Sequence, residues 1–216
     1  MHLRTIYAFF TAVLGLLACT QALRHPETPL QANFKPAPVP DTLRFEVTRD
    51  DEQSSPGDTI PNTLFFTAVP LRFLQEIGYV ADSAQALVLG RRRFPLDDST
   101  DACWVDIRQF WFQHQSLLLY DKRRQTFTGR VTVAEWYGGD GGQALTGSWM
   151  LDFDGDGDRD LVWREIQHSM RPEADSMRED FYESAMLLAW KGGRFVEQPL
   201  SDTALVVKQF PIRSMW

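Results

Sequence analysis

Five aspartates alternate with other residues between Asp152 and Asp160, in the segment Asp-Phe-Asp-Gly-Asp-Gly-Asp-Arg-Asp. Positions 1, 3, 5 and 9 of this segment are Asp152, Asp154, Asp156 and Asp160. Their carboxylates can converge only if the backbone curls tightly, and Gly157 at position 6 supplies the φ/ψ freedom for such a curl. Hard oxygen ligands at this spacing suit a cation that takes six to eight oxygens, which favours Ca²⁺.

The charge density of this segment supports the same interpretation. Five carboxylates in nine residues repel one another, and a divalent cation converts that repulsion into attraction. The alternative is a surface turn without an ion, since turns favour Asp and Gly. An EF-hand is excluded because its bidentate Glu at position 12 is replaced by Trp163. We expect a structural Ca²⁺ site with a dissociation constant of about 10⁻⁴ to 10⁻³ M, as in extracellular modules.

Other residue types capable of chemistry are scattered. His25, His114 and His168 have no second ligand at zinc spacing and are interpreted as isolated surface or turn histidines. Cys103, in an apolar run, is expected to be a buried and inert thiol. The glycine-rich stretch 138–142 precedes a strand rather than a helix, so it predicts a hairpin turn and not a phosphate loop. No catalytic residue is predicted.

The aspartate segment lies between two expected strands, Leu145–Leu151 and Asp160–Trp163. Short turns, among them residues 113–115, separate most of the other strands, which predicts antiparallel neighbours. A short helix is expected over 71–77, and a loop or short helix over 170–183. The remaining expected strands are 43–48, 86–89, 93–96, 104–112, 116–120, 126–136, 184–190, 195–197 and 203–210. The sequence thus predicts a mainly β domain of antiparallel hairpins with a minor helix.

With its flanking strands, the stretch Asp152-x-Asp154-Gly155-Asp156-Gly157-x-x-Asp160-Leu161 resembles the calcium loop of FG-GAP and VCBS repeats, which are blades of extracellular β-propellers. The resemblance implies that the side chains of the four aspartates and the backbone carbonyl of Asp158 ligate Ca²⁺. A weaker similarity covers residues 103–198. The loop occurs once, so we expect one blade-like unit and not a full propeller. Whether Glu165 or the acidic segment 173–183 joins a cation site is left open.

The first residues resemble the export signal of a bacterial lipoprotein. Arg4 precedes an uncharged apolar run, Ile6–Leu17, which is too short for a stable membrane span. The end of this run, Leu16-Leu17-Ala18-Cys19, is similar to a lipobox, in which the cysteine is acylated with fatty acids such as palmitate and becomes the mature N-terminus. Thr20 after the cysteine resembles the sorting preference for the outer membrane. The alternative is a cysteine buried in an N-terminal helix.

The next residues are polar and rich in proline, which predicts an extended tether. The expected organisation is a signal peptide over 1–18, a lipidated N-terminus and tether over 19–41, and a β domain over 42–216 that carries the calcium loop at 152–160. The protein is then held by lipid in the bacterial cell envelope, at the outer membrane rather than the inner one. Its domain faces the periplasm or the cell surface.

Composition narrows the function. The formal net charge of −7 argues against a nucleic-acid partner. We expect a non-enzymatic binding or assembly protein with an unknown protein or glycan partner, or a subunit of a larger surface complex. The alternative is a secreted hydrolase or hydrolase inhibitor acting on glycans or cell-wall polymers. Trp111, Trp136 or Tyr137 could line a carbohydrate platform, and core packing is the alternative for each.

Overall fold

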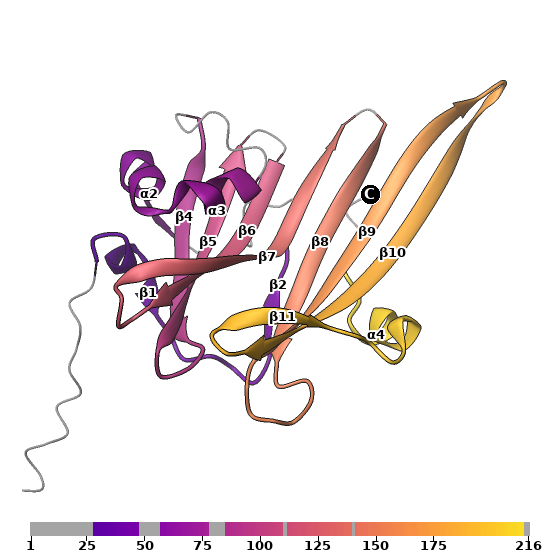
Figure 1. Ribbon diagram of the computed structural model, residues 1–216. Coiled ribbons are helices and arrows are strands. Elements are labelled where there is room, and N and C mark those ends of the chain that lie inside the picture. The colour runs from indigo at the N-terminus through magenta and orange to yellow at the C-terminus, as the bar shows by residue number, and fades with distance from the viewer. Residues whose placement is uncertain (1–27, 48–56, 78–84, 110–111, 140, 214–216) are drawn as a thin grey trace, which may run out of the picture.

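One large open sheet dominates the molecule (Figure 1). The computed structural model describes residues 28–47, 57–77, 85–109, 112–139 and 141–213. Within them, eleven strands form the sheet in the order β1-β4-β5-β6-β7-β8-β9-β10-β11, while β2 pairs with β8 and β3 with β4. All pairs are antiparallel except β1 with β4. The predicted mainly β, antiparallel fold is confirmed, and these strands form a single sheet rather than a ring of blades.

The strands are short at the N-terminal side and long in the second half of the chain. Their bounds are β1 (Lys35–Pro36), β2 (Leu43–Phe45), β3 (Asp58–Thr59), β4 (Leu87–Pro95), β5 (Thr100–Gln109), β6 (Phe112–Asp121), β7 (Thr126–Gly139), β8 (Gly142–Leu151), β9 (Asp160–Glu173), β10 (Ser176–Lys191) and β11 (Arg194–Gln198). The helices are η1 (Gln31–Asn33), α2 (Asn62–Ala68), α3 (Leu71–Glu76) and α4 (Thr203–Gln209). No helix among these residues is both long and apolar enough to cross a bilayer.

Two clusters of buried side chains hold the body together. The first joins η1, α2 and α3 to strands β4, β5 and β6, and includes Phe65, Phe73 and Val105. The second joins β2 to strands β4 to β10, and includes Phe45 and Leu117. Burial of such side chains is the main stabilising term of a domain of this size.

The predicted tether is wrong for the residues from Thr28 onward. Leu30 and Phe34 are each only 1% exposed and belong to the first core cluster. Lys35 and Pro36 form β1, which pairs in parallel with β4. The prolines in this stretch therefore mark an irregular path across the sheet edge, where a missing N–H is tolerated. Residues 19–27 lie outside the described residues.

Residues 170–183 form neither a long loop nor a helix but the outer part of a long hairpin, made by β9 and β10. β9 and β10 pair in register from Ser176 opposite Glu173 to Leu188 opposite Leu161, and Figure 1 shows this hairpin projecting from the body. Both faces of a projecting hairpin meet solvent, so its sequence lacks the alternation of apolar and polar residues that usually reveals a strand.

The predicted last strand, 203–210, is the helix α4 instead. The carboxylate of Asp202 accepts a hydrogen bond from the backbone N–H of Leu205 at 2.9 Å and so caps the helix. Val206 and Phe210, four residues apart, lie on one helical face and pack on Trp149 in a third buried cluster. Cap and packing together outweigh the strand preference of the two valines.

The turn predicted at 113–115 is also wrong, because these residues belong to β6. Their polar side chains have partners on neighbouring strands. Gln113 donates to Asp106, and Gln115 accepts from the indole N–H of Trp104 at 3.2 Å. The two strands predicted at 86–89 and 93–96 are one continuous strand, β4, with a register shift after Gly90.

Candidate metal centre

The aspartate loop connects β8 to β9 at one end of the sheet. Leu151, the last residue of β8, is paired with Asp160, the first residue of β9. The eight residues between them therefore form a loop whose two ends are held together by the sheet. Gly155 and Gly157 have φ angles of 81° and 92°. These are left-handed conformations that other residues adopt only with strain, which explains the two glycines.

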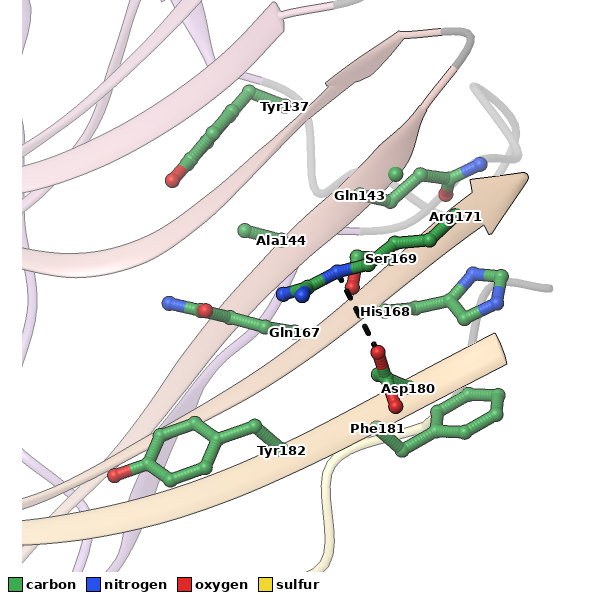
Figure 2. Close-up of a pocket in the computed structure, with 11 residues that line it drawn as sticks. Tyr137, Gln143, Ala144, Gln167, His168, Ser169, Arg171, Asp180, Phe181 and Tyr182 are labelled. Carbon is green, nitrogen blue, oxygen red and sulfur yellow. Dashed lines mark ion pairs between the residues drawn. The ribbon is translucent and has the colours of Figure 1, made fainter. Parts of the chain in front are cut away.

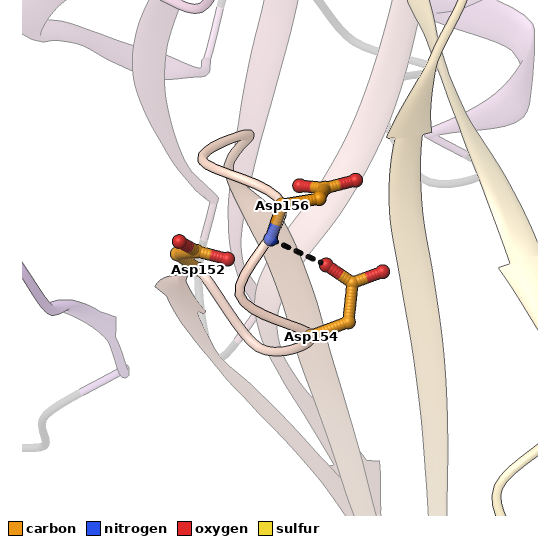
Figure 3. Close-up of side chains that lie close together, drawn as sticks. All are labelled: Asp152, Asp154 and Asp156. Atoms are coloured by element: carbon orange, nitrogen blue, oxygen red, sulfur yellow. Dashed lines mark hydrogen bonds between the residues drawn. The ribbon is translucent and has the colours of Figure 1, made fainter.

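Three of the predicted ligands gather in this loop (Figure 3). Asp152 accepts hydrogen bonds from the backbone N–H groups of Gly155 and Gly157, at 2.8 and 3.1 Å. Asp154 and Asp156 each accept from the N–H two residues further on, at 3.2 and 2.9 Å. These local hydrogen bonds restrain all three side chains against the backbone of the loop.

The three carboxylates lie close enough to one another to share one cation. One carboxylate oxygen from each of Asp152, Asp154 and Asp156 lies within 4.8 Å of the others, and all three residues are exposed. The cluster could therefore hold a metal ion.

Asp160 has a different position from the other predicted ligands. It is 2% exposed, and its two oxygens accept from the backbone N–H groups of Phe153 and Trp190, each at 3.2 Å. Burial raises the pKa of this carboxyl, and the charges of Asp154 and Asp156 act in the same direction, against the two hydrogen bonds. Asp160 thus fixes the buried base of the loop, while Asp152, Asp154 and Asp156 are exposed to solvent.

The side chains of the remaining predicted residues lie apart from the cluster, and ligation by the backbone carbonyl of Asp158 stays a prediction. Asp158 is exposed, and its N–H donates to Asp156. Glu165 lies further along β9, where it accepts a hydrogen bond from Gln167 at 3.0 Å. The acidic segment 173–183 belongs to the projecting hairpin, at the opposite end of β9 from the loop. Cys19, the predicted lipidation site, lies outside the described residues.

The loop is fixed to the body at two further points. The ring of Phe153 packs near that of Phe210, just after α4, and the two ring centres are 6.4 Å apart. Arg159 donates to the backbone carbonyl of Asp41 at 2.9 Å. The loop therefore contacts both the N-terminal segment and the C-terminal helix region, which are far apart in sequence.

Sequence reasoning missed a buried polar chain on β6 and β7. The Nε2 atom of His114 lies 2.6 Å from Ser116 Oγ, and its Nδ1 atom lies 2.6 Å from a carboxylate oxygen of Glu135. Arg130 donates to Ser116 Oγ at 3.0 Å. Burial lowers the pKa of His114, against the raising effect of Glu135. The signal was available, because residues 114 and 116 share one face of any strand.

The interpretation of His114 as a surface or turn histidine is thus wrong, since it is fully buried. Cys103 is fully buried as well, as predicted, and burial raises the pKa of its thiol. The stretch 138–142 joins β7 to β8 as predicted, with Gly139 paired to Gly142. His168, on the projecting hairpin, stacks on Phe181 with ring centres 4.5 Å apart.

A hollow of about 380 Å³ lies beside that pair of rings (Figure 2). Tyr137, Gln143, Gln167, Arg171 and Tyr182 are among the side chains that line it. It contains one acidic side chain, Asp180, so it lacks the pair of opposed carboxylates that glycoside hydrolysis requires.

No protein-family model, no curated protein and no solved structure matches this chain.

Proposed function

We propose that the protein is an exported, lipid-anchored, calcium-binding β domain of the bacterial cell envelope, and that it acts by binding or assembly rather than catalysis. The observation that carries the proposal is the convergence of Asp152, Asp154 and Asp156 within 4.8 Å in an exposed loop. Outside the cytoplasm, calcium at millimolar concentration is sufficient for a site of such modest affinity. The lipobox-like residues 16–19 support the anchor.

The proposed role of the ion is structural. At 1 mM Ca²⁺ and a dissociation constant of about 10⁻⁴ M, binding stabilises the native state by about 1.4 kcal/mol. That free energy orders a loop but does not fold a domain. The loop touches Asp41 and Phe210, so an ordered loop also fixes the N-terminal and C-terminal segments against the sheet.

Fractionation of cells tests the proposed lipid anchor and outer-membrane location. The wild-type chain is expected in the outer-membrane fraction, in a form that incorporates labelled palmitate. The Cys19→Ser variant is expected to lose the label and to leave the membrane fraction. Cys103→Ser is the matched control, because the thiol of Cys103 is buried and unreactive. A Cys19→Ser variant that still sediments with membranes contradicts the anchor.

Affinity capture tests binding as the activity. The full chain, solubilised from envelopes, is expected to retain a partner in 1 mM Ca²⁺ and to release it in chelator if the loop organises the binding surface. The same capture with Asp154→Ala and Asp156→Ala combined is expected to match the result in chelator. Capture of the same partners under all three conditions would show that partner binding does not depend on the calcium ion.

A hydrolase is the second candidate, and one observation favours it. Ser116, His114 and Glu135 stand at the distances of a Ser-His-Glu triad. However, Ser116 and His114 are fully buried, and the guanidinium of Arg130 donates a hydrogen bond to the hydroxyl oxygen of Ser116. We expect the chain to resist a fluorophosphonate probe. Labelling that is lost in Ser116→Ala would establish the hydrolase instead.

A further inference from the structure

The hollow in Figure 2 lies far from the aspartate loop. It is built on β7, β8, β9 and β10 at the ends where the projecting hairpin leaves the body. Asp160 and Gln167 are seven residues apart on β9, which corresponds to about 23 Å. The hollow is therefore a separate feature with its own side chains.

One cross-strand row forms its framework. Tyr137 is paired with Ala144, Ala144 with Gln167, and Gln167 with Tyr182, so these four side chains share one face of the sheet. Figure 2 shows Tyr137, Gln167 and Tyr182 extending to the same side, while Phe181 points away from them. The two tyrosines stand three strand spacings apart, or about 14 Å.

Small residues form the floor between the tyrosines. Ala144 is 5% exposed, and the next row on the same face holds Gly142 and Ser169. A Cβ atom on Gly142 would lie 2.4 Å from the carbonyl oxygen of His168, so the close approach of β8 and β9 requires glycine here. The hollow thus follows from the choice of side chains on the sheet, and its volume is within the range of small-molecule sites.

The walls combine aromatic rings with paired polar groups. Tyr182 and Tyr137 are 60% and 39% exposed, which is unusual for large aromatic side chains. Arg171 forms an ion pair with Asp180 at 3.5 Å, and Arg178 forms another with the same carboxylate at 2.9 Å. The guanidinium and carboxylate groups offer several hydrogen-bond donors and acceptors. Because their charges are paired with each other, they can bind an uncharged ligand.

The surrounding charge selects against an acidic ligand. Between residues 164 and 183 the chain carries three arginines and six acidic side chains. An anionic polymer would be repelled by this excess of negative charge. A neutral ligand with apolar C–H faces and many hydroxyl groups suits exposed tyrosine rings beside a donor–acceptor pair.

We propose that this hollow binds a short neutral oligosaccharide. A sugar ring packs its C–H face on Tyr182 or Tyr137, and its hydroxyl groups bond to Arg171, Asp180 and Gln167. The proposal rests on the proposed binding function and deepens it by adding a glycan partner, bound at a site separate from any surface that the calcium loop organises. Because the loop and the hollow are about 23 Å apart, the sugar site does not require the ion.

Calorimetric titration and saturation-transfer NMR with defined sugars test the proposal. The probes are tetrasaccharides of α-glucan, β-glucan, chitin and mannan, with tetragalacturonate as the acidic comparison. The full chain is kept in a phosphocholine detergent, so that no sugar headgroup competes. At least one neutral probe is expected to bind saturably with a dissociation constant of about 0.1 to 1 mM, and tetragalacturonate is not.

Two variants probe the hollow in different ways. Tyr182→Ala removes an aromatic wall and is expected to weaken binding at least about tenfold. Ser169→Phe fills the floor without removing any wall and is expected to abolish binding. Leu205→Ala is the matched control, because Leu205 is 58% exposed but lies on α4, outside the hollow, and it is expected to bind like wild type.

The outcomes separate this proposal from the calcium site. Absence of saturable binding to every neutral probe overturns it, and so does wild-type affinity in both Tyr182→Ala and Ser169→Phe. The combined Asp154→Ala and Asp156→Ala variant is expected to bind sugar like wild type. In the wild-type chain, sugar binding without calcium binding would contradict the calcium loop alone, and calcium binding without sugar binding would contradict the sugar site alone.

Discussion

The carboxylate of Asp160 accepts a hydrogen bond from the backbone N–H of Trp190 at 3.2 Å, across thirty residues of sequence. The other oxygen of the same carboxylate accepts from Phe153, the second residue of the aspartate loop. Trp190 in turn donates its indole N–H to Asp97 at 3.1 Å, in the turn between β4 and β5. One buried acid therefore connects the candidate metal loop to the C-terminal hairpin and, through Trp190, to the first half of the sheet.

Replacement of Asp160 by Asn is expected to destabilise the protein by about 1 to 3 kcal/mol. The amide keeps the shape but places an N–H₂ group against one of two buried backbone donors, which leaves that donor unsatisfied. Urea denaturation measures the difference in the free energy of unfolding. Asp158→Asn is the matched control, because Asp158 is exposed, and its stability is expected to equal that of wild type. Equal stability of both variants would contradict the role of Asp160 at the loop base.

Replacement of Gly157 by Ala is expected to cost about 1 kcal/mol in the absence of calcium. Its φ of 92° is strained for any residue with a Cβ, although open space surrounds it. The strain also opposes the curl, so weaker calcium binding is expected. Gly139→Ala has similar open space and no positive φ, and serves as the control in thermal unfolding. Unchanged stability in Gly157→Ala would show that the loop does not hold this curl.

Acidification below about pH 6.5 is expected to destabilise the protein through His114. Burial lowers the pKa of His114 in the folded state, so the unfolded chain takes up a proton at a higher pH than the native chain does. Stability then rises with pH in this window, with a slope of at most about 1.4 kcal/mol per pH unit for one proton. Denaturation curves from pH 7 downward measure the slope, and it is expected to be smaller in His114→Gln.

The control for this prediction is His168→Gln, which removes a histidine that stacks on Phe181 in the projecting hairpin. It is expected to keep the wild-type slope. A slope lost equally in both variants would assign the effect to something other than the buried chain of Ser116, His114 and Glu135.

Replacement of Arg164 by Lys is expected to loosen α4 and to cost about 3 kcal/mol. Arg164 is 1% exposed and donates to the carbonyl oxygens of Val207 and Phe210, at 2.6 and 2.7 Å. Lysine keeps the charge but not the planar fork, and leaves buried carbonyls without donors. Hydrogen exchange is expected to increase at residues 203–209 first. Exchange that increases uniformly over the whole sheet would contradict a local role.

The sequence predicted the parts of the fold in which local pattern and tertiary context agree. The end of β8, the start of β9 and the loop between them are predicted correctly, because the apolar runs end where the acidic residues begin. α3 was predicted from its apolar spacing. The three aspartates that converge alternate over only five consecutive residues, so their geometry is local and can be predicted from the sequence.

The errors arose where distant contacts decide. The strand preference of residues 203–210 is overruled by the cap at Asp202 and by carbonyl bonds to Arg164, and the latter is invisible without the fold. His114 resembles a turn residue because its carboxylate partner, Glu135, lies on another strand, β7. Asp160 was predicted beside the other ligands, and its burial depends on Trp190, which no loop motif includes.

Calorimetric titration of the full chain with Ca²⁺ tests the central claim most directly. One site with a dissociation constant of about 10⁻⁴ to 10⁻³ M is expected. The combined Asp154→Ala and Asp156→Ala variant is expected to give no binding heat and to remain folded. Glu173→Ala combined with Asp175→Ala removes the same charge from the far hairpin, and is expected to bind like wild type. No calcium uptake by the wild-type chain, or equal uptake by both double variants, would contradict the assignment of the metal to this loop.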